Sequence, residues 1–180
     1  MKRQVLLPLV IVFWLAAPLA AQQRFFFFEE PKPFKHPAKI PGAVLDVMRH
    51  EITNRPECGV NPYMNPSGWF FGSRVYLAPN RRAFILRTHQ DCLNGADNDW
   101  FWIVLKTSGG YRMVLFDGTI SVYVRGSKSH GLRDIETNAA TAAIAFRKVY
   151  KFDGDVYKLA ECFEAMPVEA KLKRVPCRNQ

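Results

Sequence analysis

Apolar residues recur at helical spacing in one short segment near the start of the chain. Between residues 42 and 54 they lie three or four positions apart, and polar residues fill the intervening positions. This period predicts an amphipathic helix with one buried face, which Pro56 is expected to end. The expected buried positions are Val44, Val47, Met48 and Ile52, and the polar ones are Asp46, Arg49, Glu51 and Asn54.

The pattern then changes to short runs rich in β-branched and aromatic residues, which are typical of strands. A turn at His130-Gly131 is expected to precede a further strand that starts near Leu132. The pattern predicts an α+β fold, in which the N-terminal helix packs on one antiparallel sheet of about seven strands. The expected strands are Trp69–Leu77, Arg82–Thr88, Trp100–Lys106, Tyr111–Phe116, Thr119–Val124, Phe146–Phe152 and Val156–Ala160.

Two Phe-Asp-Gly tripeptides stand between strand patterns, at residues 116–118 and 152–154. Asp-Gly favours a tight hairpin because both central residues of a type I′ turn need positive φ. We therefore expect a hairpin turn at each tripeptide.

The first residues of the chain are typical of a secretory signal peptide. A basic start at Lys2 and Arg3 precedes an apolar run that ends in small residues, and the predicted mature chain begins at Gln22. The alternative is an uncleaved membrane anchor, which Pro8 and Pro18 disfavour as a helix. No membrane span is expected after cleavage, and the predicted location is the periplasm or the exterior.

Residues 22–41 combine four adjacent phenylalanines with four prolines, which predicts an extended arm. We expect the arm to dock on its own domain or on a partner, and the alternative is an unstructured linker. The expected organisation is a signal peptide at 1–21, the arm at 22–41, a globular domain at 42–164 and a basic tail at 165–180. The phenylalanines are Phe25, Phe26, Phe27 and Phe28.

Four cysteines in an exported chain predict two disulfides. Three pairings are possible, and we favour Cys58 with Cys92 and Cys162 with Cys177 because each closes a modest loop. The second bridge would tie the tail back to the domain. A zinc site is disfavoured because no C-x-x-C spacing occurs and the histidines are scattered.

The chain has 180 residues, 48% of them apolar, and a formal net charge of +9, so it is expected to fold as one domain rather than to be disordered. Its 25 basic residues are spread in separate pairs and fit no nucleic-acid-binding motif. A nucleic-acid partner is therefore not expected. An unknown protein or an anionic envelope polymer suits the charge and the predicted location better.

Three sets of polar residues could carry chemistry. An acidic loop offers oxygen ligands for calcium, but it lacks EF-hand spacing and also suits an ordinary turn. A Ser-His-Asp set invites a hydrolase, but it lacks the sharp G-x-S-x-G turn. Paired carboxylates for sugar hydrolysis leave no linear signature. The calcium candidates are Asp91, Asn94, Asp97 and Asp99; the hydrolase set is Ser129, His130 and Asp134; the acids also include Glu51 and Glu136.

Aromatic residues cluster on two expected strands and could form an open platform for a sugar or a protein. The alternative is that both sheet faces are covered and all the rings are core. The candidate binding residues are Trp69, Phe71, Trp100 and Trp102.

The C-terminal half carries a Gly-Leu-x-Asp-Ile strand followed by a Tyr-x-Phe-Asp-Gly-x-x-Tyr hairpin. In these motifs it resembles uncharacterised exported bacterial proteins and, more distantly, single FG-GAP-type repeats. The resemblance implies a small β-rich extracytoplasmic module and carries no activity with it. Its residues are Gly131, Leu132, Asp134, Ile135, Tyr150, Phe152, Asp153, Gly154 and Tyr157.

Together these observations predict an exported binding module of unknown ligand, with the aromatic sheet face and the arm as contact surfaces. The partner would be another protein, an enzyme to be inhibited, or an envelope polymer. The alternatives are a small secreted hydrolase that uses paired carboxylates and a structural envelope component. No cofactor is expected.

Overall fold

Ten strands, one α-helix and a short 3-10 helix make up the part of the chain that the computed structural model describes, residues 23–26, 34–53, 66–88, 99–166 and 171–177. The predicted signal peptide lies outside it. The elements are β1 (Gln23–Phe26), α1 (Gly42–Thr53), η2 (Pro66–Gly68), β2 (Phe70–Ala78), β3 (Arg81–Thr88), β4 (Asp99–Thr107), β5 (Gly110–Thr119), β6 (Ser121–Ser129), β7 (Leu132–Ala140), β8 (Ala145–Phe152), β9 (Tyr157–Ala165) and β10 (Lys173–Val175).

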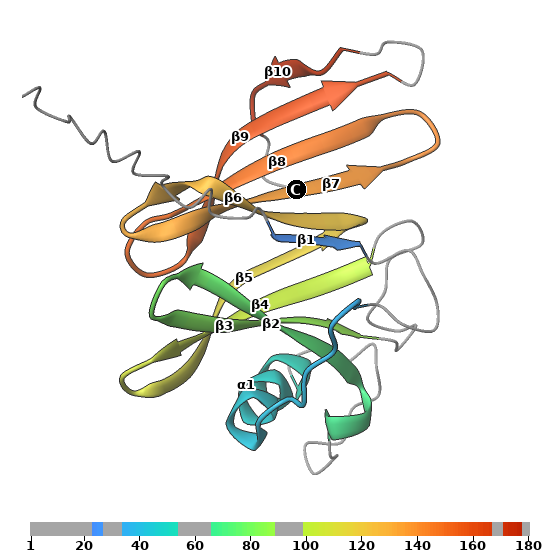
Figure 1. Cartoon of the computed structure of the whole chain (residues 1–180). Helices are drawn as coiled ribbons and strands as arrows, with labels where there is room; N and C mark the ends of the chain where they lie inside the picture. The colour runs from blue at the N-terminus through green and yellow to red at the C-terminus, as the bar shows by residue number, and fades with distance from the viewer. Residues whose placement is uncertain (1–22, 27–33, 54–65, 89–98, 167–170, 178–180) are drawn as a thin grey trace, which may run out of the picture.

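The strands form two antiparallel sheets rather than one, so the prediction of a single sheet of about seven strands is wrong. β2 to β5 follow one another in a four-stranded sheet, and β1 and β6 to β10 form a six-stranded sheet in the order β1-β6-β7-β8-β9-β10. The sheets stack on each other, with α1 on the far side of the four-stranded sheet (Figure 1). The molecule is therefore mainly β, in three layers.

The chain passes between the sheets directly after β5. The hydroxyl of Thr119 donates to the carbonyl of Asn138 at 2.6 Å, and the backbone N–H of Ile120 donates to the same carbonyl at 2.9 Å. These bonds join the end of β5 to β7 of the other sheet. Strand patterns identify strands but not the sheet that each one joins, which is why the sequence did not show this crossing.

The two Phe-Asp-Gly tripeptides behave differently. At residues 152–154 the predicted hairpin is confirmed: Gly154 has a φ of 109°, and the Asp153 carboxylate accepts the N–H groups of Asp155 and Val156, each at 2.8 Å. At residues 116–118 the predicted turn is wrong, because β5 continues and Asp117 pairs with Phe101 of β4.

The turn expected at His130-Gly131 is confirmed. Both residues have positive φ, 46° and 82°, and Ser129 pairs with Leu132 across them. This is the backbone geometry that a two-residue hairpin requires.

One hydrophobic core lies between the sheets and a second lies between the four-stranded sheet and α1. Alternate residues of β4 supply both cores, so this strand is apolar on both faces, as expected for a strand covered on two sides. The predicted helix is confirmed, and three of its expected buried residues are buried. The β4 residues are Phe101, Ile103 and Leu105 in the inter-sheet core and Trp102 and Val104 in the helix-side core. The buried residues of α1 are Val44, Met48 and Ile52.

The predicted arm is extended where it is described, and it lies against its own domain. β1 pairs with β6, and Phe34 is buried in the inter-sheet core. Further along, the N–H of Ala38 donates to the carbonyl of Gly72 at 2.8 Å. The arm passes so close that a Cβ on Gly72 would lie 2.7 Å from Cγ1 of Ile40, which explains the glycine at this position of β2.

The predicted disulfide between Cys162 and Cys177 is present, with 5.3 Å between the Cα atoms. It fastens the segment that carries β10 to β9. Cys58 and Cys92 lie outside the described residues, so their predicted pairing stays a prediction.

Replacing Cys162 and Cys177 together with alanine should lower the free energy of unfolding by about 3 kcal/mol, because the bridge closes a loop of 15 residues in the unfolded chain. Urea unfolding under oxidising conditions measures the change. Met166→Ala, at an exposed side chain between the two cysteines, is the control and should have a small effect. An unchanged midpoint in the double variant would show that the bridge does not stabilise the fold.

Candidate binding surface

The four aromatic residues predicted to bind a partner do not share one exposed face. Trp102 is only 2% exposed; its ring lies 5.4 Å from that of Phe70 and 5.3 Å from that of Phe116, in the core under α1. Trp69 and Trp100 are half-buried at the same core, whereas Phe71 packs against the inter-sheet core. For Trp102 the structure favours the alternative that the ring is core. A binding role for the other three stays a prediction.

Of the four calcium candidates, the structure describes only Asp99. Asp91, Asn94 and Asp97 lie outside the described residues. Asp99 forms an ion pair with Arg87 at 2.7 Å. In the described ranges, no group of three His, Cys, Asp or Glu side chains could hold a metal ion.

The Ser-His-Asp set does not form a triad. Oγ of Ser129 donates directly to Asp134 at 2.7 Å, while Nδ1 of His130 lies 2.7 Å from the carbonyl oxygen of Phe152. The histidine thus faces a different group from the serine. Among the acids considered for sugar hydrolysis, Glu136 lies 3.5 Å from a guanidinium nitrogen of Arg125, and Glu51 lies on α1.

A different surface emerges from the register of the four-stranded sheet. Tyr76 pairs with Arg82, and Lys106 pairs with Tyr111. The pairing of β3 with β4 brings Arg82 level with Lys106. All four side chains lie on the helix side of the sheet, because they alternate with the inter-sheet positions. Tyr111 packs against the helix-side core, and the other three are exposed. We call Tyr76, Arg82, Lys106 and Tyr111 the basic row.

The cations of this surface have no acidic partner in the described part of the chain. The four strands contain two acids, Asp99 and Asp117, and both form ion pairs elsewhere. Arg112 of β5 pairs with Asp155. On the helix side of the sheet this leaves Arg74, Arg82 and Lys106 exposed to solvent, where they create a local positive potential. Arg81 of β3 is exposed as well.

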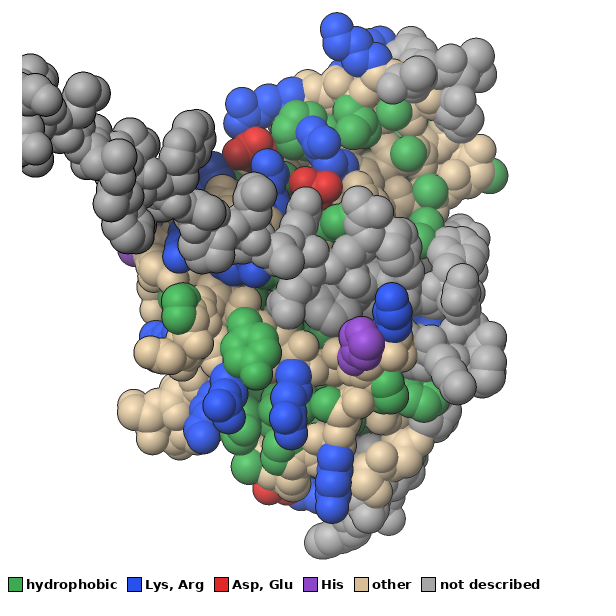
Figure 2. Space-filling model, viewed as in Figure 1, with side chains coloured by type: hydrophobic (Ala, Val, Ile, Leu, Met, Phe, Trp, Pro, Cys, Tyr) green, Lys and Arg blue, Asp and Glu red, His purple; other side chains and the backbone are tan. Residues whose placement is uncertain are grey.

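The surface also offers an aromatic ring and a groove. Tyr76 is 43% exposed, and an open groove of about 390 Å³ is lined by arm and β2 residues. In the lower half of Figure 2, Lys, Arg and His side chains surround hydrophobic ones on this side of the molecule. The described lining residues are His36, Pro37, Ala38, Lys39, Ser73 and Arg74.

Opposite charges meet at some positions of the six-stranded sheet. Lys151 lies 3.0 Å from Glu161, and Arg125 lies near Glu136. The hydrogen bond from Lys151 lowers the pKa of Glu161. These pairs reduce the potential around them, whereas Lys128, Lys158 and Arg174 on the same sheet are exposed and form no ion pair with another described residue.

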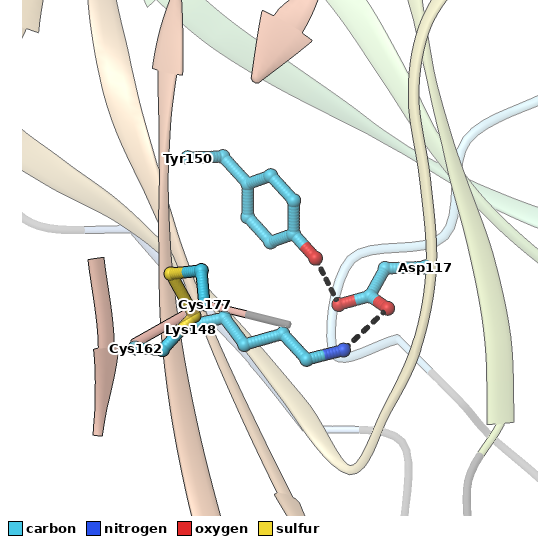
Figure 3. The surroundings of a disulfide bond; sticks show 5 residues. All are labelled: Asp117, Lys148, Tyr150, Cys162 and Cys177. Atoms are coloured by element: carbon cyan, nitrogen blue, oxygen red, sulfur yellow. Dashed lines mark hydrogen bonds and ion pairs between the residues drawn. A yellow bond between two sulfur atoms is a disulfide. The ribbon is translucent and has the colours of Figure 1, made fainter. Parts of the chain in front are cut away.

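An interior polar cluster joins the two sheets, and we call it the Asp117 clasp (Figure 3). The carboxylate of Asp117 on β5 accepts hydrogen bonds from Tyr150 Oη at 2.7 Å, Lys148 Nζ at 3.0 Å and Thr137 Oγ1 at 3.2 Å. The three donors belong to β7 and β8 of the other sheet. Burial and then the charge of Asp117 raise the pKa of Tyr150, so its hydroxyl is a stable donor at neutral pH.

No protein-family model, curated protein or solved structure matches the chain. Across the described segments, no helix is long and apolar enough to cross a membrane.

Stability should fall as the pH rises above about 10, because tyrosines of the unfolded chain ionise there. In the folded chain burial raises the pKa of both Tyr150 and Tyr157 above that value. The folded state thus holds more protons in this range. Urea midpoints measured between about pH 9 and about pH 11 should fall less steeply for Tyr150→Phe than for the wild type. Parallel curves would contradict the raised pKa of Tyr150.

Proposed function

We propose that this chain is an exported binding module that holds an anionic partner on the basic row and the cations beside it. The observation that carries the proposal is the group of three exposed cations, Arg74, Arg82 and Lys106, without an acidic partner among the described residues. The contact surface thus differs from the tryptophan face expected from the sequence. Its border includes the arm, at His36 and Lys39.

The sheet supports binding because it fixes where the charges lie. Neighbouring strands are about 4.8 Å apart, so the basic row spans about 14 Å from β2 to β5. The backbone beneath it is hydrogen-bonded in register and packed on two cores. Little order has to be gained in the backbone on binding, which favours affinity.

Two features support export. The N-terminal pattern is typical of a signal peptide, and the Cys162–Cys177 bridge is of the kind that persists in oxidising compartments. Anionic polymers and acidic proteins would both be partners there. A hydrolase would need two facing carboxylates or a complete triad, and the contacts of Asp134, Glu136 and His130 do not favour either.

Replacing Arg74, Arg82 and Lys106 with glutamine should weaken binding to dextran sulfate, used as a generic polyanion, by about tenfold or more. The expectation follows from about 0.5 kcal/mol or more for each lost contact. The apparent Kd from titration at several salt concentrations measures this, and the salt dependence should also become less steep.

A charge-matched control separates the surface from net charge. Lys128, Lys158 and Lys171 are exposed residues on or beside the six-stranded sheet, and their replacement with glutamine should leave affinity nearly unchanged. Circular dichroism checks that both variants are folded. Equal losses in the two variants, or no binding by the wild type, would refute the proposed function.

A further inference from the structure

We infer that the partner on the basic row is an acidic polysaccharide, an inference that rests on the proposed function and names its ligand class. The order of the row suits such a chain, because a tyrosine stands at each end and two cations lie between them. A sugar polymer that carries carboxylates or sulfates presents both ring faces and charges along its length.

Tyr76 is the first observation that selects this ligand. In the described part of the chain, the exposed large hydrophobic side chains are Tyr76 and Met166. Tyr76 stands near the end of β2, an edge strand of its sheet, between the buried residues Val75 and Leu77, and the exposed Arg74 lies two positions away on the same face. An exposed ring beside cations is a feature of contact surfaces, because it offers apolar area at a small cost in conformational entropy.

Ring chemistry gives the second step. The face of a tyrosine ring is electron-rich, and the C–H groups on one side of a pyranose ring pack against such a face. Tyr111, at the other end of the row, is partly buried and is held edge-to-face by Phe84, with 6.2 Å between the ring centroids. The two tyrosines therefore mark the ends of a track about 14 Å long, enough for a short run of sugar rings.

The cations between the rings supply the third step. The guanidinium of Arg82 can bind a carboxylate or a sulfate through two parallel hydrogen bonds, and the ammonium of Lys106 can bind a second anionic group as a point charge. The groove that is lined in part by Arg74 and Lys39 adds further cations to this surface. An acidic polypeptide would satisfy the cations, but it would present no sugar ring to pack against the exposed part of Tyr76.

The test compares four probes by titration against the wild type, Tyr76→Ala and Tyr76→Phe. The probes are polygalacturonate, dextran sulfate, polyglutamate and an oligothymidylate. Tyr76→Ala should bind the two polysaccharides about five- to tenfold more weakly, the range expected for one aromatic contact, and should bind polyglutamate unchanged. Tyr76→Phe keeps the ring and should retain the affinity. Met166→Ala is the matched control, because it removes the other exposed hydrophobic side chain.

The outcomes separate this inference from the proposed function. If polyglutamate binds as tightly as the polysaccharides and Tyr76→Ala changes nothing, the ligand is an acidic polypeptide, and the loss on removing the three cations still supports an anionic partner. Preference for the oligothymidylate would make the ligand a nucleic acid and overturn the inference. Absence of binding to every probe would overturn both the inference and the proposed function.

Discussion

The carboxylate of Asp117 is the constraint on which the arrangement of the layers depends. It belongs to the four-stranded sheet, and its three side-chain donors belong to the six-stranded sheet. A partly buried carboxylate is costly unless it is paired and hydrogen-bonded, so the sheets are stabilised when they stack in the geometry that brings Lys148, Tyr150 and Thr137 to it. Next to it, Thr119 and Ile120 bind the backbone of β7. The six-stranded sheet therefore covers one face of the four-stranded sheet.

The other face of that sheet is divided between core and solvent. Helix α1 covers the rings around Trp102, and within the described residues Tyr76, Arg82 and Lys106 are exposed at the far end of the face. There Arg82 and Lys106 lie level on neighbouring strands, although like charges directly opposite each other destabilise a sheet. Departures from a local stability rule concentrate at functional sites. The two acids of the four-stranded sheet, Asp99 and Asp117, form ion pairs with Arg87 and Lys148 instead.

The sequence predicted local structure well and the assembly of sheets poorly. Helix α1 was predictable because its apolar residues have one period, and the Cys162–Cys177 pairing because it closes a short loop. The Phe-Asp-Gly at residues 152–154 turns because Asp153 binds its own turn, whereas Asp117 instead binds side chains of the other sheet. That difference depends on residues far along the chain, so the tripeptide alone could not distinguish the two.

The basic row was missed for a similar reason. Its residues are scattered over four strands, and only the register makes them neighbours. A local signal was present at Arg74 and Tyr76, polar or aromatic residues two positions apart in a strand whose other face is apolar. The tryptophans were the more conspicuous candidates, but the helix covers Trp102, and sequence periodicity does not reveal which face a helix covers.

The most direct test of the account is a map of the ligand on the folded protein by nuclear magnetic resonance. Backbone amide shifts would be followed while a galacturonate oligomer is added. We expect the largest changes at Arg74, Tyr76, Arg82, Lys106 and Tyr111, with small changes over β7, β8 and β9. Changes centred on the six-stranded sheet, or spread evenly over the surface, would contradict the assignment of binding to the basic row.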